Sequence, residues 1–453
     1  MTRLPRAGRG DVPVLAVLLG AALLAWPAIL NGYPLLFSDT GAFLHQTAPP
    51  PSGPLVIWDK PHVYGPLLHL FHWRLTLWLP MAAQALMVSW LLWLTQRLLR
   101  GGASARLHLL VSAGTAALTT APFTVALLMP DVFAPAVLLA LLLLGFARDA
   151  LSRAEAWGLA LLAALGMAAH LSHLPMAAAI ALLVLLMTRR IASTLRVAAP
   201  IAAALAILLG TNLWGHGRLA LSPHGATFLL ARLQADGPAA EVIRRRCPEA
   251  GWYLCAFTEH LPMDSDQFLW APDSPVNRAP DGSARFLGGA MLSPEAGAIL
   301  AETFRTVPVE VGAAMLRNTI RQLLMADAGD TLVPDHLAVA VRPRIAEAFP
   351  PREVAAYDAA RQPRGDLRGL AEPLRWPHRL VLLAGTVAAL IACWRAARMR
   401  DLRRFGLILG VLVGVTANAV AAGALSRPNP RYEARILWLV PVVAILAWPM
   451  RRA

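Results

Sequence analysis

The stretch FGLILGVLVGVTANAVAAG, residues 405–423, runs for 19 residues without a charged side chain. A transmembrane helix needs about 20 consecutive, mostly apolar residues to cross the hydrocarbon core. Arg403 and Arg404 directly precede the stretch, and cytoplasmic ends of membrane helices are enriched in arginine and lysine. We therefore predict a membrane span that starts on the cytoplasmic side.

Further apolar stretches are spread along both halves of the chain. With residues 405–423 they give about ten predicted spans, near 12–30, 75–95, 107–129, 132–147, 155–170, 174–188, 197–213, 378–394, 405–423 and 436–450. The 453-residue chain is 57% apolar, with a mean hydropathy of +0.54. These values are typical of an integral membrane protein. We expect an all-α polytopic membrane protein.

Arginines occupy every second connection between the predicted spans. They are Arg3, Arg6 and Arg9, then Arg97, Arg100 and Arg106, then Arg148 and Arg153, then Arg189, Arg190 and Arg196, then Arg395, Arg398, Arg400, Arg403 and Arg404, and finally Arg451 and Arg452. The positive-inside rule makes these connections cytoplasmic, so both termini are predicted inside. Much of the formal charge of +14 lies in these turns, where it orients helices and meets anionic lipid, so it does not indicate nucleic acid.

This topology divides the chain into three parts. Residues 1–213 hold about seven spans and the first outer loop, 31–74. Residues 214–377 form an outer insert, expected to be mostly helical, and residues 378–453 hold the last three spans. Within the insert, Ser293 followed by Pro294 predicts a helix start, because serine caps helices and proline favours the first helical position. A second helix is predicted from Pro334 to about Ala348.

The insert also contains two of the three cysteines. Cys247 and Cys255 are predicted on the oxidising side of the membrane, where a disulfide can persist. The alternative is two unpaired thiols buried beside Trp252. Cys393 is expected at the cytoplasmic end of the eighth span.

Polar residues deep in the predicted spans are amides and hydroxyls, namely Gln84, Thr119, Asn212 and Asn418. An ion-coupled carrier would normally hold a charged residue there. The charged residues gather instead near the predicted outer ends of the spans. This pattern favours an enzyme that acts at the outer membrane surface on a substrate with a polar head and a lipid tail.

The first outer loop is the richest in reactive groups, with Asp39, Lys60, His62 and Tyr64. Lys60 is the only lysine in the chain, and its compact ammonium suits a phosphate; chance retention is the alternative. Asp39 could take a proton from an acceptor hydroxyl, or it could only cap a helix together with its neighbours.

Other outer residues have similar alternatives. Asp131 follows Pro130 and could act in the site or merely cap the fourth span. His170 and His173 favour hydrogen bonding over metal binding, since no third ligand lies nearby in the sequence. Arg427, Arg431 and Arg435 lie on the outer side against the positive-inside tendency. They could bind a phosphate or diphosphate, or pair with Glu433 or lipid.

With these residues in view, the chain resembles the GT-C class of membrane glycosyltransferases, including protein O-mannosyltransferases and lipid A aminoarabinose transferases. The similarity lies in Asp39, in Lys60 with Pro61, in Asp131, and in Arg431 with Tyr432. The resemblance implies that Asp39 is the base, that Lys60 and Arg431 hold carrier phosphate, and that Asp131 orients the acceptor or a metal. Many members of this class have two adjacent acidic residues in the first loop, where this chain has one. Whether the activity depends on a divalent cation therefore stays open.

We therefore expect an enzyme of the bacterial inner membrane with its active face in the periplasm. It would move a sugar from a polyprenyl-phosphate carrier to a hydroxyl of a lipid, glycan or protein, in one displacement with inversion. His62, Tyr64, His173 and Tyr432 are expected substrate contacts, and Arg427 and Arg435 further phosphate contacts. The alternatives are a polymerase or ligase of lipid-linked glycans, a transporter or flippase, and a non-catalytic assembly subunit.

Overall fold

The computed structural model describes residues 13–49 and 56–448. The arginines predicted at the two ends of the chain, Arg3, Arg6, Arg9, Arg451 and Arg452, lie outside these residues. Within the described ranges the regular structure is helical, as the sequence predicts, apart from isolated bridges between Leu35 and Leu127 and between Arg278 and Ala284.

Four helices are long and apolar enough to cross a membrane: α5 (Trp78–Arg100), α11 (Ile191–His216), α20 (Glu372–Arg398) and α21 (Leu402–Leu425). They support a membrane-embedded protein. Helices also cover the other predicted apolar stretches: α1 (Val14–Leu24), α2 (Trp26–Asn31), α6 (Ala105–Leu118), α7 (Ala121–Ala126), α8 (Phe133–Phe146), α9 (Arg153–Ala169), α10 (His173–Thr188), α22 (Pro430–Leu437) and α23 (Leu439–Ala447). These are shorter, so ten crossings and the orientation in the membrane stay predictions.

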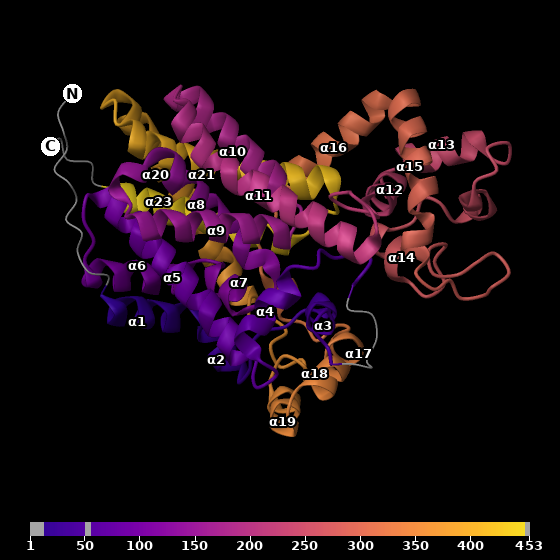
Figure 1. The fold of residues 1–453 in the computed structure, drawn as a ribbon, viewed down its shortest axis with the longest axis horizontal. Coiled ribbons are helices and arrows are strands. Elements are labelled where there is room, and N and C mark those ends of the chain that lie inside the picture. The colour runs from indigo at the N-terminus through magenta and orange to yellow at the C-terminus, as the bar shows by residue number, and fades with distance from the viewer. Residues whose placement is uncertain (1–12, 50–55, 449–453) are drawn as a thin grey trace.

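The apolar helices form one bundle, with α1, α6 and α23 toward one end (Figure 1). The insert helices within residues 225–306 lie at the other end, whereas those within residues 337–359 lie below the middle of the bundle. Packing between α21 and α8 relies on glycine. Cβ atoms at Gly406, Gly410 and Gly414 would lie within 3.0 Å of side chains on α8, namely Phe146, Leu142 and Leu138. Small residues four apart let membrane helices approach closely, and here they bring α21 against the centre of the bundle.

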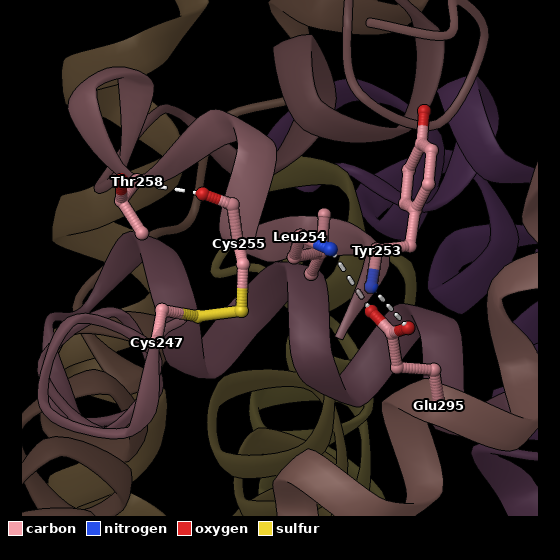
Figure 2. The surroundings of a disulfide bond; sticks show 6 residues. All are labelled: Cys247, Tyr253, Leu254, Cys255, Thr258 and Glu295. Atoms are coloured by element: carbon pink, nitrogen blue, oxygen red, sulfur yellow. Dashed lines mark hydrogen bonds between the residues drawn. A yellow bond between two sulfur atoms is a disulfide. The ribbon is translucent and has the colours of Figure 1, made fainter. Parts of the chain in front are cut away.

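The first half of the predicted insert has its own hydrophobic core. We call residues 225–315 the disulfide lobe; it contains α12 (Gly225–Ala235), α13 (Pro238–Arg246), η3 (Tyr253–His260), α14 (Ser265–Trp270), α15 (Gly288–Thr306) and the start of α16 (Pro308–Leu323). A disulfide joins Cys247 to Cys255, and Glu295 of α15 accepts hydrogen bonds from the backbone N–H groups of Tyr253 (2.6 Å) and Leu254 (3.1 Å) (Figure 2).

The second half of the insert packs on the membrane helices instead. We call residues 326–371 the docking segment; it contains η4 (Gly329–Thr331), α17 (Leu337–Ala340), α18 (Arg342–Ala348) and α19 (Pro351–Ala359), and it shares the main core. Tyr33 donates a 2.6 Å hydrogen bond to buried Glu353. Gln362 accepts from the backbone N–H of Leu36 and donates to its carbonyl. The docking segment therefore holds residues 31–37 in place.

Two predicted helices of the insert have different bounds in the structure. Ser293 and Pro294 lie inside α15, which begins at Gly288 rather than at the serine. The stretch from Pro334 to Ala348 is divided into α17 and α18 at Val341. Capping and proline patterns are local signals, and tertiary packing overrides them here.

Replacing Gly410 with valine tests the close approach of α21 and α8. The added side chain meets Leu142, so we expect a loss of about 1–3 kcal/mol of stability, as for other overpacked cores. Thermal unfolding in detergent measures it. Gly210→Ala in α11 is the control, because nothing lies within 4 Å of its Cβ position; equal melting temperatures for the two variants would contradict this packing.

Candidate functional site

Five of the predicted site residues lie together where four segments meet. Asp39 comes from α3 (Ser38–His45), Lys60 from the loop before α4 (Tyr64–His72), Asp131 from η1 (Pro130–Val132), and Arg431 and Arg435 from α22. We call this group the charged cluster. It also includes Asn418 from the last third of α21 and Ser172 from the turn between α9 and α10.

The backbone around Asp39 is held by neighbours on both sides. Leu35 pairs with residues 126–128, and the Thr40 hydroxyl donates to the carbonyl of Leu128 at 3.0 Å. On the other side Gly41 lies against the backbone of Ala340, where a Cβ would clash. Asp39 lies in the first turn of α3, whose cap is Phe37, so Asp39 is not itself the capping residue.

Lys60 lies between two carboxylates. Its Nζ is 3.2 Å from Oδ1 of Asp39 and also pairs with Asp59. Burial alone would lower the pKa of Lys60, but Asp39 and Asp59 raise it above its usual value. Burial likewise opposes the charge on Asp39, yet Lys60 and then Arg431 hold the pKa of Asp39 below its usual value. Both groups are therefore charged at neutral pH.

Asp131 is a buried carboxylate that holds two arginines. Its Oδ1 is 3.2 Å from Arg435 and 3.7 Å from Arg431, and the residue is 1% exposed. Burial opposes ionisation, but these arginines keep the pKa of Asp131 below its usual value. Arg435 also donates to Asn418 (2.8 Å) and Ser172 (2.9 Å). This network joins α22 to η1, α21 and the α9–α10 turn.

Arg431 has hydrogen-bond donors to spare. The residue is 6% exposed, and its guanidinium lies 3.9 Å from the centre of the Phe37 ring. Its Nε faces Asp131 at 3.7 Å, beyond hydrogen-bond distance, and one terminal nitrogen has no hydrogen-bond partner, although buried polar groups are normally paired. Asp330 of η4 lies near it, and burial raises the pKa of Asp330 to about 6. An anion that reached Arg431 would therefore find unused donors.

Access to the cluster is greatest at Asp39, whose side chain is 38% exposed, whereas those of Lys60 and Asp59 are 11% and 6% exposed. Three carboxylates, on Asp39, Asp59 and Asp131, face three cations, on Lys60, Arg431 and Arg435. The arrangement offers a water-accessible base beside cations that can exchange a carboxylate for a phosphate.

Among residues 13–49 and 56–448 no three His, Cys, Asp or Glu side chains are grouped to hold a metal.

The other predicted site residues lie around or away from the cluster. Arg427 is exposed and pairs with Asp264 and Asp266 of the disulfide lobe. Tyr64 is buried and donates to Gln84 at 2.7 Å. The ring of His62 lies 5.2 Å from the ring of Trp214. His173 forms a 2.8 Å hydrogen bond with the carbonyl of Gly166. The ring of Tyr432 lies 5.2 Å from the guanidinium groups of both Arg431 and Arg435.

Sequence reasoning did not include Asp330 in the site, because this residue lies in the long insert without any motif around it. Asn418 stands out in the sequence only as a polar residue deep in a predicted span. A polar side chain inside an otherwise apolar span is expensive to bury, so it signals a partner. The structure shows that its partners are Arg435, the carbonyl of Tyr432 and Glu433.

The pairing of Arg435 can be tested against that of Arg427. Arg435→Gln leaves Asp131 buried with one distant partner, and breaking a buried ion pair costs about 3–5 kcal/mol. Arg427→Gln removes an exposed pair, which is worth about 0–1 kcal/mol. We expect thermal unfolding in detergent to separate the two variants clearly; similar melting temperatures would refute the structural importance of the Asp131 network.

Glu433 makes stability depend on pH. The residue is fully buried, one oxygen accepts from Asn418 at 3.1 Å, and burial raises its pKa from 4.5 to about 8. The folded state prefers the neutral acid. The contribution of Glu433 to the free energy of unfolding is therefore fully present below pH 4.5 and is lost as the pH rises through about 8. Glu433→Gln should therefore gain stability relative to the wild type between about pH 5 and pH 8.

Melting temperatures across this pH range measure the effect. Glu310→Gln, at an exposed position on α16, is the matched control and should follow the wild-type curve. Parallel curves for Glu433→Gln and the wild type would show that Glu433 does not hold its proton.

Comparisons of the chain with family models, with curated proteins and with solved structures found no match. The resemblance carried by Asp39, Lys60, Asp131 and Arg431 therefore stays a prediction.

Proposed function

We propose that the protein is a membrane glycosyltransferase that moves a sugar from a polyprenyl-phosphate carrier to an acceptor hydroxyl. The reaction would take place on the periplasmic side of a bacterial inner membrane. One observation carries the proposal: Asp39, the more exposed of the two acids paired with Lys60, lies within electrostatic reach of a buried arginine, Arg431, whose terminal nitrogen has unused donors. A base and a phosphate-binding group are thus available in one place.

In the proposed reaction Asp39 accepts the proton of the acceptor hydroxyl as its oxygen attacks the anomeric carbon. The bond from that carbon to the carrier phosphate oxygen breaks, and the phosphate leaves with the bonding electrons. A positioned base contributes about 10²–10⁴-fold to such a reaction. Attack from the side opposite the leaving group inverts the anomeric carbon.

Lys60 and Arg431 are the proposed phosphate ligands. Charge-assisted hydrogen bonds to phosphate are short and strong, and an arginine can offer two donors at once. Preorganised cations in a site with little water also stabilise the negative charge that builds up on the leaving group. Lys60 would exchange part of its contact with Asp39 and Asp59 for the phosphate.

Asp131 has a supporting role in this proposal. Its carboxylate is almost fully buried and contacts Arg431 and Arg435, so it is a positioning residue that orients the phosphate-binding arginine. Arg435 lies deeper, with its donors on Asp131, Asn418 and Ser172, and it belongs to the same support.

The base assignment is tested with Asp39→Asn in membranes supplied with radiolabelled polyprenyl-phosphate sugars. We expect transfer of label to a new glycosidic bond to fall by about 100-fold or more, the scale of a lost general base. Asp59→Asn is the matched control, since it removes the other carboxylate on Lys60 and leaves the base; it should retain most of the activity. Membrane insertion should be unchanged in both. The two variants should lose stability to a similar extent, because each removes one carboxylate from the largely buried Lys60.

Full transfer by Asp39→Asn would refute the base assignment. A loss confined to variants of Arg431 and Arg435 would instead indicate a polymerase or ligase that depends on diphosphate binding. Movement of label between leaflets without a new bond would indicate a transporter and overturn the enzymatic proposal.

A further inference from the structure

Helix α16 carries an exposed apolar stripe. Its members are Val309, Leu316 and Ile320 of the helix and Leu324 directly after it, and each of these residues is more than half exposed. At 3.6 residues per turn, the four positions lie within about 80° of one another around the helix axis. Single exposed apolar residues are normal on a protein surface, whereas a contiguous apolar patch marks a site of interaction. The stripe therefore indicates a partner that the described residues do not supply.

The stripe has a charged border on one side only. The charged residues of α16 are all exposed and lie within about 40° of one another, between the stripe and the buried side of the helix: Glu310, Arg317 and Arg321. The buried side faces the rest of the protein and holds Val311, Ala314, Asn318, Thr319 and Gln322. Helices that lie in a membrane interface are divided in the same way, with an apolar face in the acyl chains and a polar face rich in arginine and lysine.

Contacts with α21 place α16 at the end of a membrane span. Residues 405–423 of α21 carry no charge, and this stretch is about 28 Å long as a helix, close to the ~30 Å of a hydrocarbon core. A Cβ atom at Gly423 would lie 2.6 Å from the carbonyl oxygen of Asn318 and 2.9 Å from the Cα of Thr319. The middle of α16 therefore crosses α21 where the uncharged stretch ends. This point is the boundary between hydrocarbon and headgroups, whichever side of the membrane it faces.

The arginines of the border are available to an anion. Arg317 and Arg321 are exposed, and within the described part of the chain neither forms an ion pair. Burial lowers the pKa of Arg232 in the disulfide lobe, and the charges of Arg317 and Arg321 lower it further, although Asp236 opposes them. The border is thus locally positive. Lipid phosphates are the anions found at this depth, and arginine binds phosphate through charge-assisted hydrogen bonds.

We infer that α16 lies in the membrane interface and that its apolar stripe contacts the acyl chains of phospholipids. Arg317 and Arg321 would then lie at the level of the lipid phosphates. The insert is therefore not wholly outside the membrane, as the sequence predicts for residues 214–377. Because α16 follows the helices of the disulfide lobe, this contact would hold the lobe against the bilayer beside α21. The inference does not rest on the proposed glycosyl transfer.

Spin labels on single cysteines test the depth of α16 in the full-length protein in phospholipid vesicles. Cys393→Ser removes the free thiol, and one variant then carries Leu316→Cys and the other Arg317→Cys. Power-saturation electron paramagnetic resonance compares collisions of the label with O₂, which concentrates in hydrocarbon, and with a water-soluble nickel chelate. We expect the label at Leu316 to lie about 5–10 Å below the headgroups. The matched control at Arg317, the next residue, should lie at or above the phosphates.

Ile320→Cys repeats the measurement one turn later on the stripe and should give the same depth as Leu316→Cys. Asp39→Asn should leave all three depths unchanged, since transfer activity is not involved. Ready access of the nickel chelate to the labels at both Leu316 and Ile320 would show that the stripe faces water and would overturn the inference. Low access of both reagents, with spin–spin broadening between labels, would overturn it as well, because a second copy of the chain would then cover the stripe.

Discussion

The ion pairs of Asp131 with Arg431 and Arg435 are the interaction on which the rest of the site depends. All three residues are buried, and removing a charge from water costs several kcal/mol unless partners compensate it. Asp131, Asn418 and Ser172 supply the partners of Arg435 from three different segments. These segments must therefore keep their relative positions, and Arg431 is held one helical turn from Arg435, above the ring of Phe37.

Packing far from the charges makes this geometry possible. Gly406, Gly410 and Gly414 let α21 lie close to α8, which places Asn418 one turn beyond the last of them, beside α22. The docking segment plays the same part for the first loop, since Glu353 and Gln362 bind Tyr33 and Leu36 just before Asp39. The disulfide lobe completes the arrangement: Trp58 stacks on Phe228, and Lys60 lies 5.9 Å from the Trp270 ring.

These contacts explain why a base and its neighbouring cations remain charged in a crowded site. The pKa of Asp39 is held down by Lys60 and Arg431, whereas burial without a nearby cation in hydrogen-bond contact raises the pKa of Glu433 to about 8. Two acids of the same region thus differ in charge at neutral pH because their partners differ. For the proposed transfer, this difference leaves Asp39 as the carboxylate that is both ionised and open to water.

The sequence alone determined which segments are helical and apolar, since hydropathy over about 20 residues is a local property that 405–423 and the other predicted spans carry themselves. It also indicated Asp39, Lys60, Asp131 and Arg431 as chemically unusual residues, and Cys247 and Cys255 as a pair. Only the tertiary structure decided their partners. In the structure Asp131 is buried against two arginines, and Arg427 forms an ion pair with the disulfide lobe. Asp330 lies near Arg431. Contacts between residues hundreds of positions apart depend on how whole helices pack. The spacing of Gly406, Gly410 and Gly414 marks a face for close packing on α21, but it does not specify which helix lies against that face.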